Sequence, residues 1–355
     1  MTSLRWKPCL VGLAMTLATM SAGCKEAQPG LSPTPEIIPA TIGRIAFVSQ
    51  MEGDMDIYVM DADGSNQRNL TSSLDADWNP DWSPDGSRIA FGARRLGNWD
   101  IYVMNADGSN RTRLTTNTAV DSNPKWSPDG SRILFLSDRD GNVEVYVMQA
   151  DGSNQTRLTD DPEGVVAPTW SPWSPDGSRI IFGSYGKPDI YVMRTDGSNR
   201  RNLTNDPATE GEPSWSPDGS RILFYSGRNG EPQIPQVYVM DADGSNQRKL
   251  TNSSAGSFDP TWSPDGSYIA FCSYRNGNNL SIYVMLADGS NEIRLTTGPE
   301  DRKPAWSPDG SRIAYWSRVD RDWHICTMNA DGSEQIRLIK AGDENGFWGF
   351  VWSPE

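Results

Sequence analysis

The ten residues Trp82–Phe91, WSPDGSRIAF, decide the fold, because close copies of this phrase recur along the chain. Pro84 presets the backbone for the second position of a type I turn, and Gly86 accepts the left-handed conformation that follows. The phrase therefore predicts a hairpin in which one strand ends at Trp82 and the next begins at Arg88. The other copies of its tryptophan are Trp126, Trp173, Trp215, Trp262, Trp306 and Trp352.

Further phrases repeat in register with the first. Strands of the Arg-Ile-Ala-Phe type begin at Arg44, Arg88, Arg132, Arg179, Arg221, Tyr268 and Arg312. Strands of the Ile-Tyr-Val-Met type begin at Ile57, Ile101, Val145, Ile190, Val237, Ile282 and Ile325. Each of these is followed by a turn of the Ala-Asp-Gly-Ser-Asn type and a short Arg-x-Leu-Thr strand. Residues 43–355 thus hold seven repeats of about 45 residues each, the length of a four-stranded propeller blade.

These repeats predict an all-β fold, a single seven-bladed β-propeller of four-stranded blades over residues 43–355. Strands such as Ile57–Met60 are apolar on both faces, as strands between two neighbouring sheets must be. The repeated tryptophans are expected to fill the space between blades. The chain starts with the second strand of a blade and ends with a first strand at 350–353. We therefore expect the C-terminal strand to complete the N-terminal blade and close the ring.

Composition and charge agree with this fold and limit the partners. The chain has 33 glycines, 25 prolines and 14 tryptophans, which favours short strands joined by tight turns. Its formal net charge of −14 repels phosphate backbones, so we expect no nucleic-acid partner. Cys272 and Cys326 are expected to be buried strand residues without a disulfide.

The N-terminus is typical of an exported protein. Residues 1–23 read as a signal peptide, with two basic residues followed by an apolar stretch, Pro8–Met20, that is too short to span a bilayer. The letters SAGC ending at Cys24 resemble a bacterial lipoprotein processing site, and the alternative is ordinary cleavage after the small residues. Residues 24–42 are typical of a proline-rich tether. We therefore expect a membrane-anchored lipoprotein, acylated at Cys24, that faces the periplasm or the cell exterior.

The phrases W-S-P-D-G-x-x-I-A-F and I-Y-V-M-x-x-D-G resemble the TolB-like β-propeller repeat, a WD40-like family. The resemblance implies a setting in the cell envelope, since the protein that gives the family its name binds the peptidoglycan-associated lipoprotein of the Tol–Pal system. Three features depart from that pattern: we expect no α/β domain before the propeller, seven blades in place of six, and a lipoprotein-like Cys24. The resemblance therefore implies the fold and the envelope setting.

The residues provide no obvious constellation for catalysis. The string Asp61–Gly64 resembles a calcium loop but lacks the further oxygen ligands and the distal glutamate, and hairpin turns explain it. Asp85 and Gly86 are adjacent, whereas a sialidase Asp-box separates this pair by one residue. His324 is the only histidine, which excludes a histidine metal cluster, and no G-x-S-x-G phrase occurs. We therefore predict no catalytic residue, no metal and no cofactor.

Variation between the repeats is confined to two connections in each blade, from second to third strand and from fourth to next first strand. Both lie on one face of the predicted disc, which indicates that this face meets a partner; the alternative is a solvated rim whose acids aid solubility. The acids expected to ring the mouth of the central channel are Asp77, Asp121, Glu210 and Asp301, with Glu212 and Asp259 beside the following proline. The aromatic side chains expected to be exposed there include Trp78, Trp99, Tyr274, Trp323 and Trp348.

Two hypotheses for function follow. The favoured one is a monomeric, non-enzymatic scaffold of the cell envelope that binds a protein, peptide or cell-wall component through the variable face. The alternative is an enzyme or sensor acting on glycans or small molecules in the channel, where carboxylates such as Glu210 and Glu212 would do acid–base work.

Overall fold

The computed structural model describes residues 43–166, 171–228, 234–275, 277, 279–343, 346–347 and 349–354. The predicted signal peptide, Cys24 and the tether lie outside the described residues. All described strands belong to one compact unit, Thr41–Glu355. The described residues include no helix with the length and apolar character needed to cross a bilayer.

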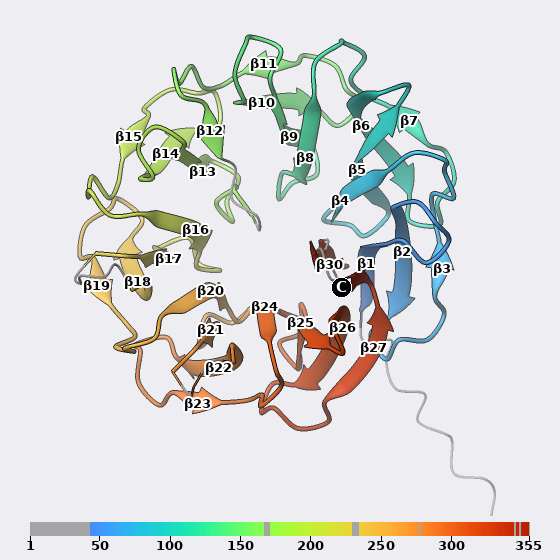
Figure 1. Cartoon of the computed structure of the whole chain (residues 1–355). Helices are drawn as coiled ribbons and strands as arrows, with labels where there is room; N and C mark the ends of the chain where they lie inside the picture. Colours follow the sequence, from blue (N-terminus) through green and yellow to red (C-terminus); the bar gives the residue numbers. More distant parts are fainter. Residues whose placement is uncertain are drawn as a thin grey trace, which may run out of the picture. The chain divides into compact units, whose positions relative to one another are not determined.

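The strands form seven four-stranded antiparallel sheets arranged as blades in a ring (Figure 1), which confirms the predicted architecture. From the centre outwards, blade 1 contains β30 (Phe350–Trp352), β1 (Arg44–Ser49), β2 (Asp56–Asp61) and β3 (Arg68–Asn69). Blade 2 contains β4 (Asp77–Trp82), β5 (Arg88–Arg95), β6 (Asn98–Asn105) and β7 (Thr112–Arg113). Blade 3 contains β8 (Asp121–Trp126), β9 (Arg132–Ser137), β10 (Glu144–Gln149) and β11 (Thr156–Arg157).

The remaining blades follow the same order. Blade 4 contains β12 (Val165–Val166), β13 (Arg179–Ser184), β14 (Ile190–Arg194) and β15 (Arg201–Asn202). Blade 5 contains β16 (Glu210–Trp215), β17 (Arg221–Ser226), β18 (Gln236–Asp241) and β19 (Arg248–Lys249). Blade 6 contains β20 (Ser257–Trp262), β21 (Tyr268–Ser273), β22 (Ser281–Leu286) and β23 (Ile293–Arg294). Blade 7 contains β24 (Asp301–Trp306), β25 (Arg312–Val319), β26 (Asp322–Asn329) and β27 (Ile336–Lys340), and a small hairpin joins β28 (Gly342–Asp343) to β29 (Gly346–Phe347).

The WSPDGS phrase forms the predicted turn between the first and second strands. In blade 2 the Gly86 amide donates a hydrogen bond to the Ser83 carbonyl at 2.8 Å, and Gly86 has φ of 65°. The Asp85 carboxylate accepts hydrogen bonds from the hydroxyl groups of Ser83 and Ser87. These hydrogen bonds lower the pKa of Asp85 to about 2. The repeated aspartate therefore closes a turn.

The repeated tryptophans fill the blade interfaces, as predicted. Trp82, at the end of β4, is buried against Ile57, Val59 and Leu70 of blade 1 and against Phe91 of its own blade. The core of the ring is thus a set of interblade clusters, each built from two neighbouring sheets. The two described cysteines, Cys272 and Cys326, are free and buried in strands, which confirms their predicted place.

The C-terminal strand closes the ring. β30 pairs antiparallel with β1, so that Trp352 lies opposite Ile45 and Phe350 lies opposite Phe47. The Ser353 amide donates to the Arg44 carbonyl at 2.7 Å, and the Arg44 amide donates to the Ser353 hydroxyl at 2.8 Å. Blade 1 therefore takes its innermost strand from the end of the chain and its other three from the beginning of the ring (Figure 1).

Candidate functional site

The hairpin topology gives the ring two unlike faces. The turns between first and second strands, and between third and fourth strands, repeat and lie together; we call this side the turn face. The connections from second to third strand and from fourth to next first strand lie on the opposite side, which we call the variable face. For blade 2, the connections on the variable face are Leu96–Gly97, between β5 and β6, and Leu114–Val120, between β7 and β8.

The acids predicted to ring the mouth of the channel lie at the start of the innermost strands, but their side chains are buried. Asp77 pairs with Arg95 at 2.7 Å, Asp121 pairs with Arg139 at 3.0 Å, and Glu210 pairs with Arg228. Burial raises the pKa of Asp77 and of Glu210 despite these partners. The prediction that these side chains ring an open mouth is therefore wrong, because each is enclosed by its own blade.

Asp301 is buried like the other three acids, although its hydrogen-bond partners differ from theirs. It is buried at the start of β24, and the Gly298 amide donates a hydrogen bond to it at 3.2 Å. Burial raises its pKa, and hydrogen bonds from the hydroxyls of Ser317 and Thr296 oppose that shift. Asp301, too, contributes to the inside of a blade.

The predicted aromatic residues divide into exposed and buried members. Trp78 and Trp99 lie together on blade 2 with ring centroids 5.4 Å apart, and Trp78 is 36% exposed. Tyr274 is half-buried and meets Phe258 edge to face at 6.0 Å. Trp323 is buried between blade 7 and blade 1, so the prediction that it is exposed is wrong. Trp348 lies outside the described residues.

Residues just before the innermost-strand proline share an unusual backbone. Each of them has a left-handed φ between 48° and 53°, and in each the strand register shifts at this point. Such a bulge re-aims a side chain at the cost of strain, which is typical of functional positions. The residues are Asn79, Asn123, Glu212, Asp259 and Lys303.

Three of these residues form one charged cluster across blades 5, 6 and 7. The Lys303 ammonium lies 3.2 Å from a Glu212 carboxylate oxygen, and the Lys303 amide lies 3.4 Å from an Asp259 carboxylate oxygen. Burial, and then the nearby Asp259, raise the pKa of Glu212 to about 8. The cluster holds two carboxylates and one cation, so one carboxylate retains its proton more readily than an exposed glutamate would.

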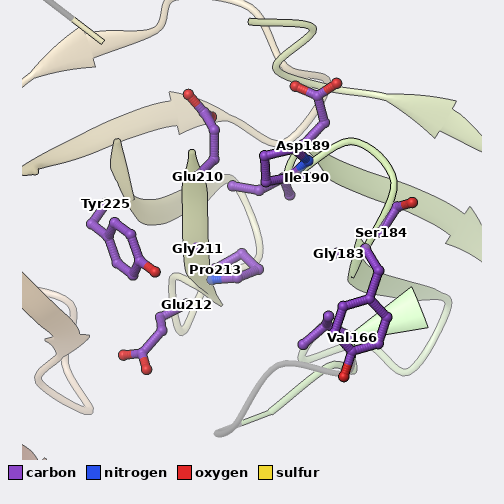
Figure 2. A pocket seen from close by; sticks show the side chains of 12 residues that line it. Val166, Gly183, Ser184, Asp189, Ile190, Glu210, Gly211, Glu212, Pro213 and Tyr225 are labelled. Atoms are coloured by element: carbon purple, nitrogen blue, oxygen red, sulfur yellow. The ribbon is translucent and has the colours of Figure 1, made fainter. Parts of the chain in front are cut away.

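A pocket of about 330 Å³ lies beside this cluster, between blades 4 and 5 (Figure 2). Its walls are mainly apolar and come from Val166, Ile190 and Pro213. Glu212 and Tyr225 line it as well, and the Tyr225 ring comes so close to Gly211 that a side chain at position 211 would collide with it. Glu212 thus reaches Lys303 of blade 7, while the neighbouring Glu210 turns to Arg228 in its own blade.

Sequence reasoning identified Glu212 and Asp259 but missed Lys303 and Leu96. The signal for Lys303 was available, since it precedes the proline of its repeat as Glu212 and Asp259 do. Leu96 precedes Gly97 in a two-residue hairpin loop between β5 and β6, where asparagine would be usual. The loop is this short because β5 extends to Arg95 and β6 begins at Asn98.

We expect Glu212→Gln to change how stability depends on pH. The folded-state pKa of Glu212 lies above its unfolded value, so wild-type stability is lost as pH rises from the ordinary carboxyl range through about 8. The variant lacks this loss, so it should be more stable than wild type by roughly 2–4 kcal/mol at pH 9, with a much smaller difference at pH 5. Urea unfolding at the two pH values measures this.

Glu334→Gln, whose parent side chain is 66% exposed, is the control and should leave the pH profile unchanged. Parallel profiles for Glu212→Gln and wild type would contradict the cluster's assigned electrostatics.

Comparison with known proteins identifies a matching family model and related proteins. The model that describes the TolB beta propeller domain matches residues 79–172 and 162–354. The Tol-Pal system protein TolB of Geobacter sulfurreducens is 47% identical over 47 residues, which is 13% of this chain and 11% of that protein. The matched stretch therefore spans about a ninth of that relative's length.

Solved structures share the fold at low sequence identity. The crystal structure of TolB from Acinetobacter baumannii matches with a TM-score of 0.56 and 24% identity over 90% of this chain and 68% of that chain. An oligogalacturonate lyase in complex with manganese matches with a TM-score of 0.62 and 16% identity over 85% of this chain and 86% of that chain. At these identities both comparisons establish the fold alone. Among the residues that the structure describes, no group of three or more His, Cys, Asp or Glu side chains is arranged to hold a metal ion.

Proposed function

The chain belongs to the TolB β-propeller family, and from this premise we propose that it is a binding scaffold of the cell envelope that engages a protein partner through its variable face. The observation that carries this proposal is the one-sided placement of exposed apolar side chains. Of the ten large apolar side chains found exposed among the described residues, seven lie in or next to connections of the variable face. These seven are Met51, Leu74, Trp78, Leu96, Val120, Val166 and Tyr185.

Leu96 is the most informative of them. It is fully exposed at the tip of the β5–β6 hairpin and has φ of 52°, with Gly97 following at 88°. A left-handed leucine costs about 1–2 kcal/mol, and here no burial of the side chain offsets that cost. Strain of this kind combined with an exposed apolar side chain is typical of a recognition site.

The surroundings of Leu96 make it part of a patch. The Arg94 amide donates to the Ala76 carbonyl at 2.8 Å, which brings the connection that carries Leu74 beside the hairpin. On the other side, the Asn98 side chain donates to the Asn117 carbonyl at 2.9 Å. The partly exposed ring of Trp78, on the neighbouring strand β4, packs against the half-buried ring of Trp99 on β6 of the hairpin. We call Leu74, Trp78, Leu96 and Trp99 the Leu96 patch.

The patch fits a protein partner better than a small molecule. Its members come from a hairpin, the neighbouring strand β4 and the connection before it, and tryptophan side chains are enriched in the centre of protein interfaces. The alternative, acid–base chemistry by Glu210 and Glu212, has less support, because the first is buried against Arg228 and the second shares Lys303 with Asp259. A pair that flanks a glycosidic bond instead needs a gap between its carboxyl groups.

Export and lipid anchoring are part of the same proposal. The apolar segment Pro8–Met20, the processing-site letters before Cys24 and the proline-rich residues 24–42 support a lipoprotein whose propeller is held at a distance from the membrane. Labelling with a radioactive fatty acid tests the anchor, since wild type should take up label and Cys24→Ser should not.

Site-specific photo-cross-linking in the native envelope tests the partner-binding role. With p-benzoylphenylalanine at the position of Leu74, irradiation should yield a covalent adduct with one envelope protein, which mass spectrometry identifies. The same residue at the position of Ile336, on the outer strand of blade 7, is the matched control and should yield none of that adduct. Equal yields at the two positions, or no adduct at position 74, would argue against binding at the Leu96 patch.

A further inference from the structure

One position of the repeat breaks its pattern at the junction of blades 6 and 7. Six of the seven second strands begin with arginine, and the seventh begins with Tyr268. At five junctions the guanidinium of that arginine lies over the tryptophan of the next blade, 4.5–5.0 Å from a ring centroid. The pairs are Arg44 with Trp82, Arg88 with Trp126, Arg132 with Trp173, Arg179 with Trp215, and Arg221 with Trp262.

The same guanidinium also lies close to backbone carbonyl groups of the next blade. Arg179 of blade 4 lies 3.2 Å from the carbonyl of Gly219 and 3.5 Å from that of Ala242, both in turns of blade 5. Arg132 of blade 3 likewise lies 3.5 Å from the carbonyl of Gly177. A planar guanidinium can stack on a ring and donate in its own plane at once, which lysine cannot do. The tryptophan ring and these turn carbonyls therefore form a recurring binding site for the chain's own guanidinium, which we call the guanidinium seat.

At the junction of blades 6 and 7 this seat is open. A pocket of about 660 Å³ lies there, lined by Trp306 and by Gly310 and Ala330, the residues equivalent to Gly219 and Ala242. Tyr268 also lines the pocket but is 44% exposed, and no cation of the described residues stacks on Trp306. The ring and the turn residues of the seat are thus present without the chain's own guanidinium.

The pocket is apolar in its walls and acidic at its edge. Val284, Ile293 and Leu295 supply apolar surface, and none of the lining residues is a lysine or arginine. Ile293 itself stands where blades 1, 4 and 5 carry Arg68, Arg201 and Arg248. Three aspartates line the pocket, and hydrogen bonds from serine hydroxyls lower the pKa of Asp265 and Asp331. This pocket therefore lacks the arginine that begins the other six second strands and also the arginine that blades 1, 4 and 5 carry in place of Ile293, while its carboxylates remain.

We propose that the pocket between blades 6 and 7 binds the arginine side chain of a peptide segment from a partner protein. The incoming guanidinium stacks on Trp306 and donates hydrogen bonds toward the turn carbonyls of Gly310 and Ala330, while Asp309 and Asp331 balance its charge. The volume exceeds that of one guanidinium group, so residues next to the arginine also find room against the apolar walls. The site lies on the turn face, and it is separate from the Leu96 patch.

Isothermal titration calorimetry with the full chain tests this site. The tripeptide Ac-Gly-Arg-Gly-NH2 should bind at least tenfold more tightly than the same peptide with citrulline, which has the shape of arginine without its charge. It should also bind more tightly than arginine amide, because the flanking residues contact the apolar walls. Equal binding of the arginine and citrulline peptides would overturn the proposal. Equal binding of arginine amide and the peptide would overturn the assignment to a peptide segment and point to the free amino acid.

The variant Tyr268→Arg separates this site from any other acidic surface. It restores the residue that the other six repeats carry, so it should fold and fill the seat with its own guanidinium. Peptide binding should then fall at least tenfold. Tyr185→Arg, which makes the same change at a tyrosine exposed on the variable face, is the control and should bind the peptide as wild type does. Undiminished binding to Tyr268→Arg would contradict the proposal, whatever the outcome at the Leu96 patch.

Discussion

A chain that ends at Gly349 should be less stable than the full chain by about 5 kcal/mol or more, because it loses the burial of two aromatic side chains. Phe350 and Trp352 are both buried in the cluster that joins blades 7 and 1. The truncation also leaves β1 with an unpaired edge on the inner side of the blade. An exposed edge of this kind pairs with other chains. Guanidinium unfolding measures the lost stability, and size-exclusion chromatography measures the self-association that we expect.

A synthetic peptide of residues 349–355 provides the control for this truncation. If β30 stabilises the ring by completing blade 1, adding the peptide should return part of the lost stability and suppress self-association. A peptide of the same composition in scrambled order should do neither. Full stability of the truncated chain without any peptide would show that the ring does not depend on this closure.

Trp82→Ala should lower the free energy of unfolding by about 3–5 kcal/mol, the usual range for removing a large buried aromatic side chain. The indole fills the interface between blades 1 and 2, and the Arg44 guanidinium lies over it, 4.8 Å from the centroid of the tryptophan ring. Both contacts are lost in the variant. The folded fraction in urea, followed by far-ultraviolet circular dichroism, measures the effect.

Trp78→Ala is the matched control for this substitution. Trp78 lies on the same strand, β4, but is partly exposed and packs mainly on Trp99. Its removal should cost less than about 1 kcal/mol, as is usual for surface positions. Similar losses for the two variants would mean that the repeated tryptophans do not hold the blades together.

The fold was predictable because its determinants are local and repeated. Pro84, Asp85 and Gly86 specify a turn through backbone preferences and nearby hydrogen bonds, so the sequence alone locates both strands beside it. The repeat length then fixes the number of blades, and the partial repeat at Trp352 indicates how the ring closes. Each of these features depends on residues that are close in the sequence or appear in every copy.

The site was only partly predictable, because burial there depends on distant partners. Asp77 reads as a loop acid, but Arg95, the last residue of β5, pairs with it. Lys303 and Glu212 are 91 residues apart, so no local pattern announces their ion pair. Trp323 looks like an exposed loop aromatic, yet β26 begins at Asp322 and places it in a core cluster. The sequence located the face on which the repeats diverge, but four of the acids predicted there, Asp77, Asp121, Glu210 and Asp301, are buried inside their own blades.

The variant Leu96→Asn tests the central claim that the variable face binds a protein through an exposed apolar patch. Asparagine followed by glycine suits a two-residue hairpin loop, so the variant should be more stable than wild type by about 1 kcal/mol. It should nevertheless bind the partner found by cross-linking at least tenfold more weakly, because the apolar tip of the hairpin is gone. The measurement is the affinity of the two proteins for that partner, with urea unfolding run on the same samples. Weaker binding by a more stable protein is the predicted result, and unchanged affinity in the stabilised variant would contradict the account.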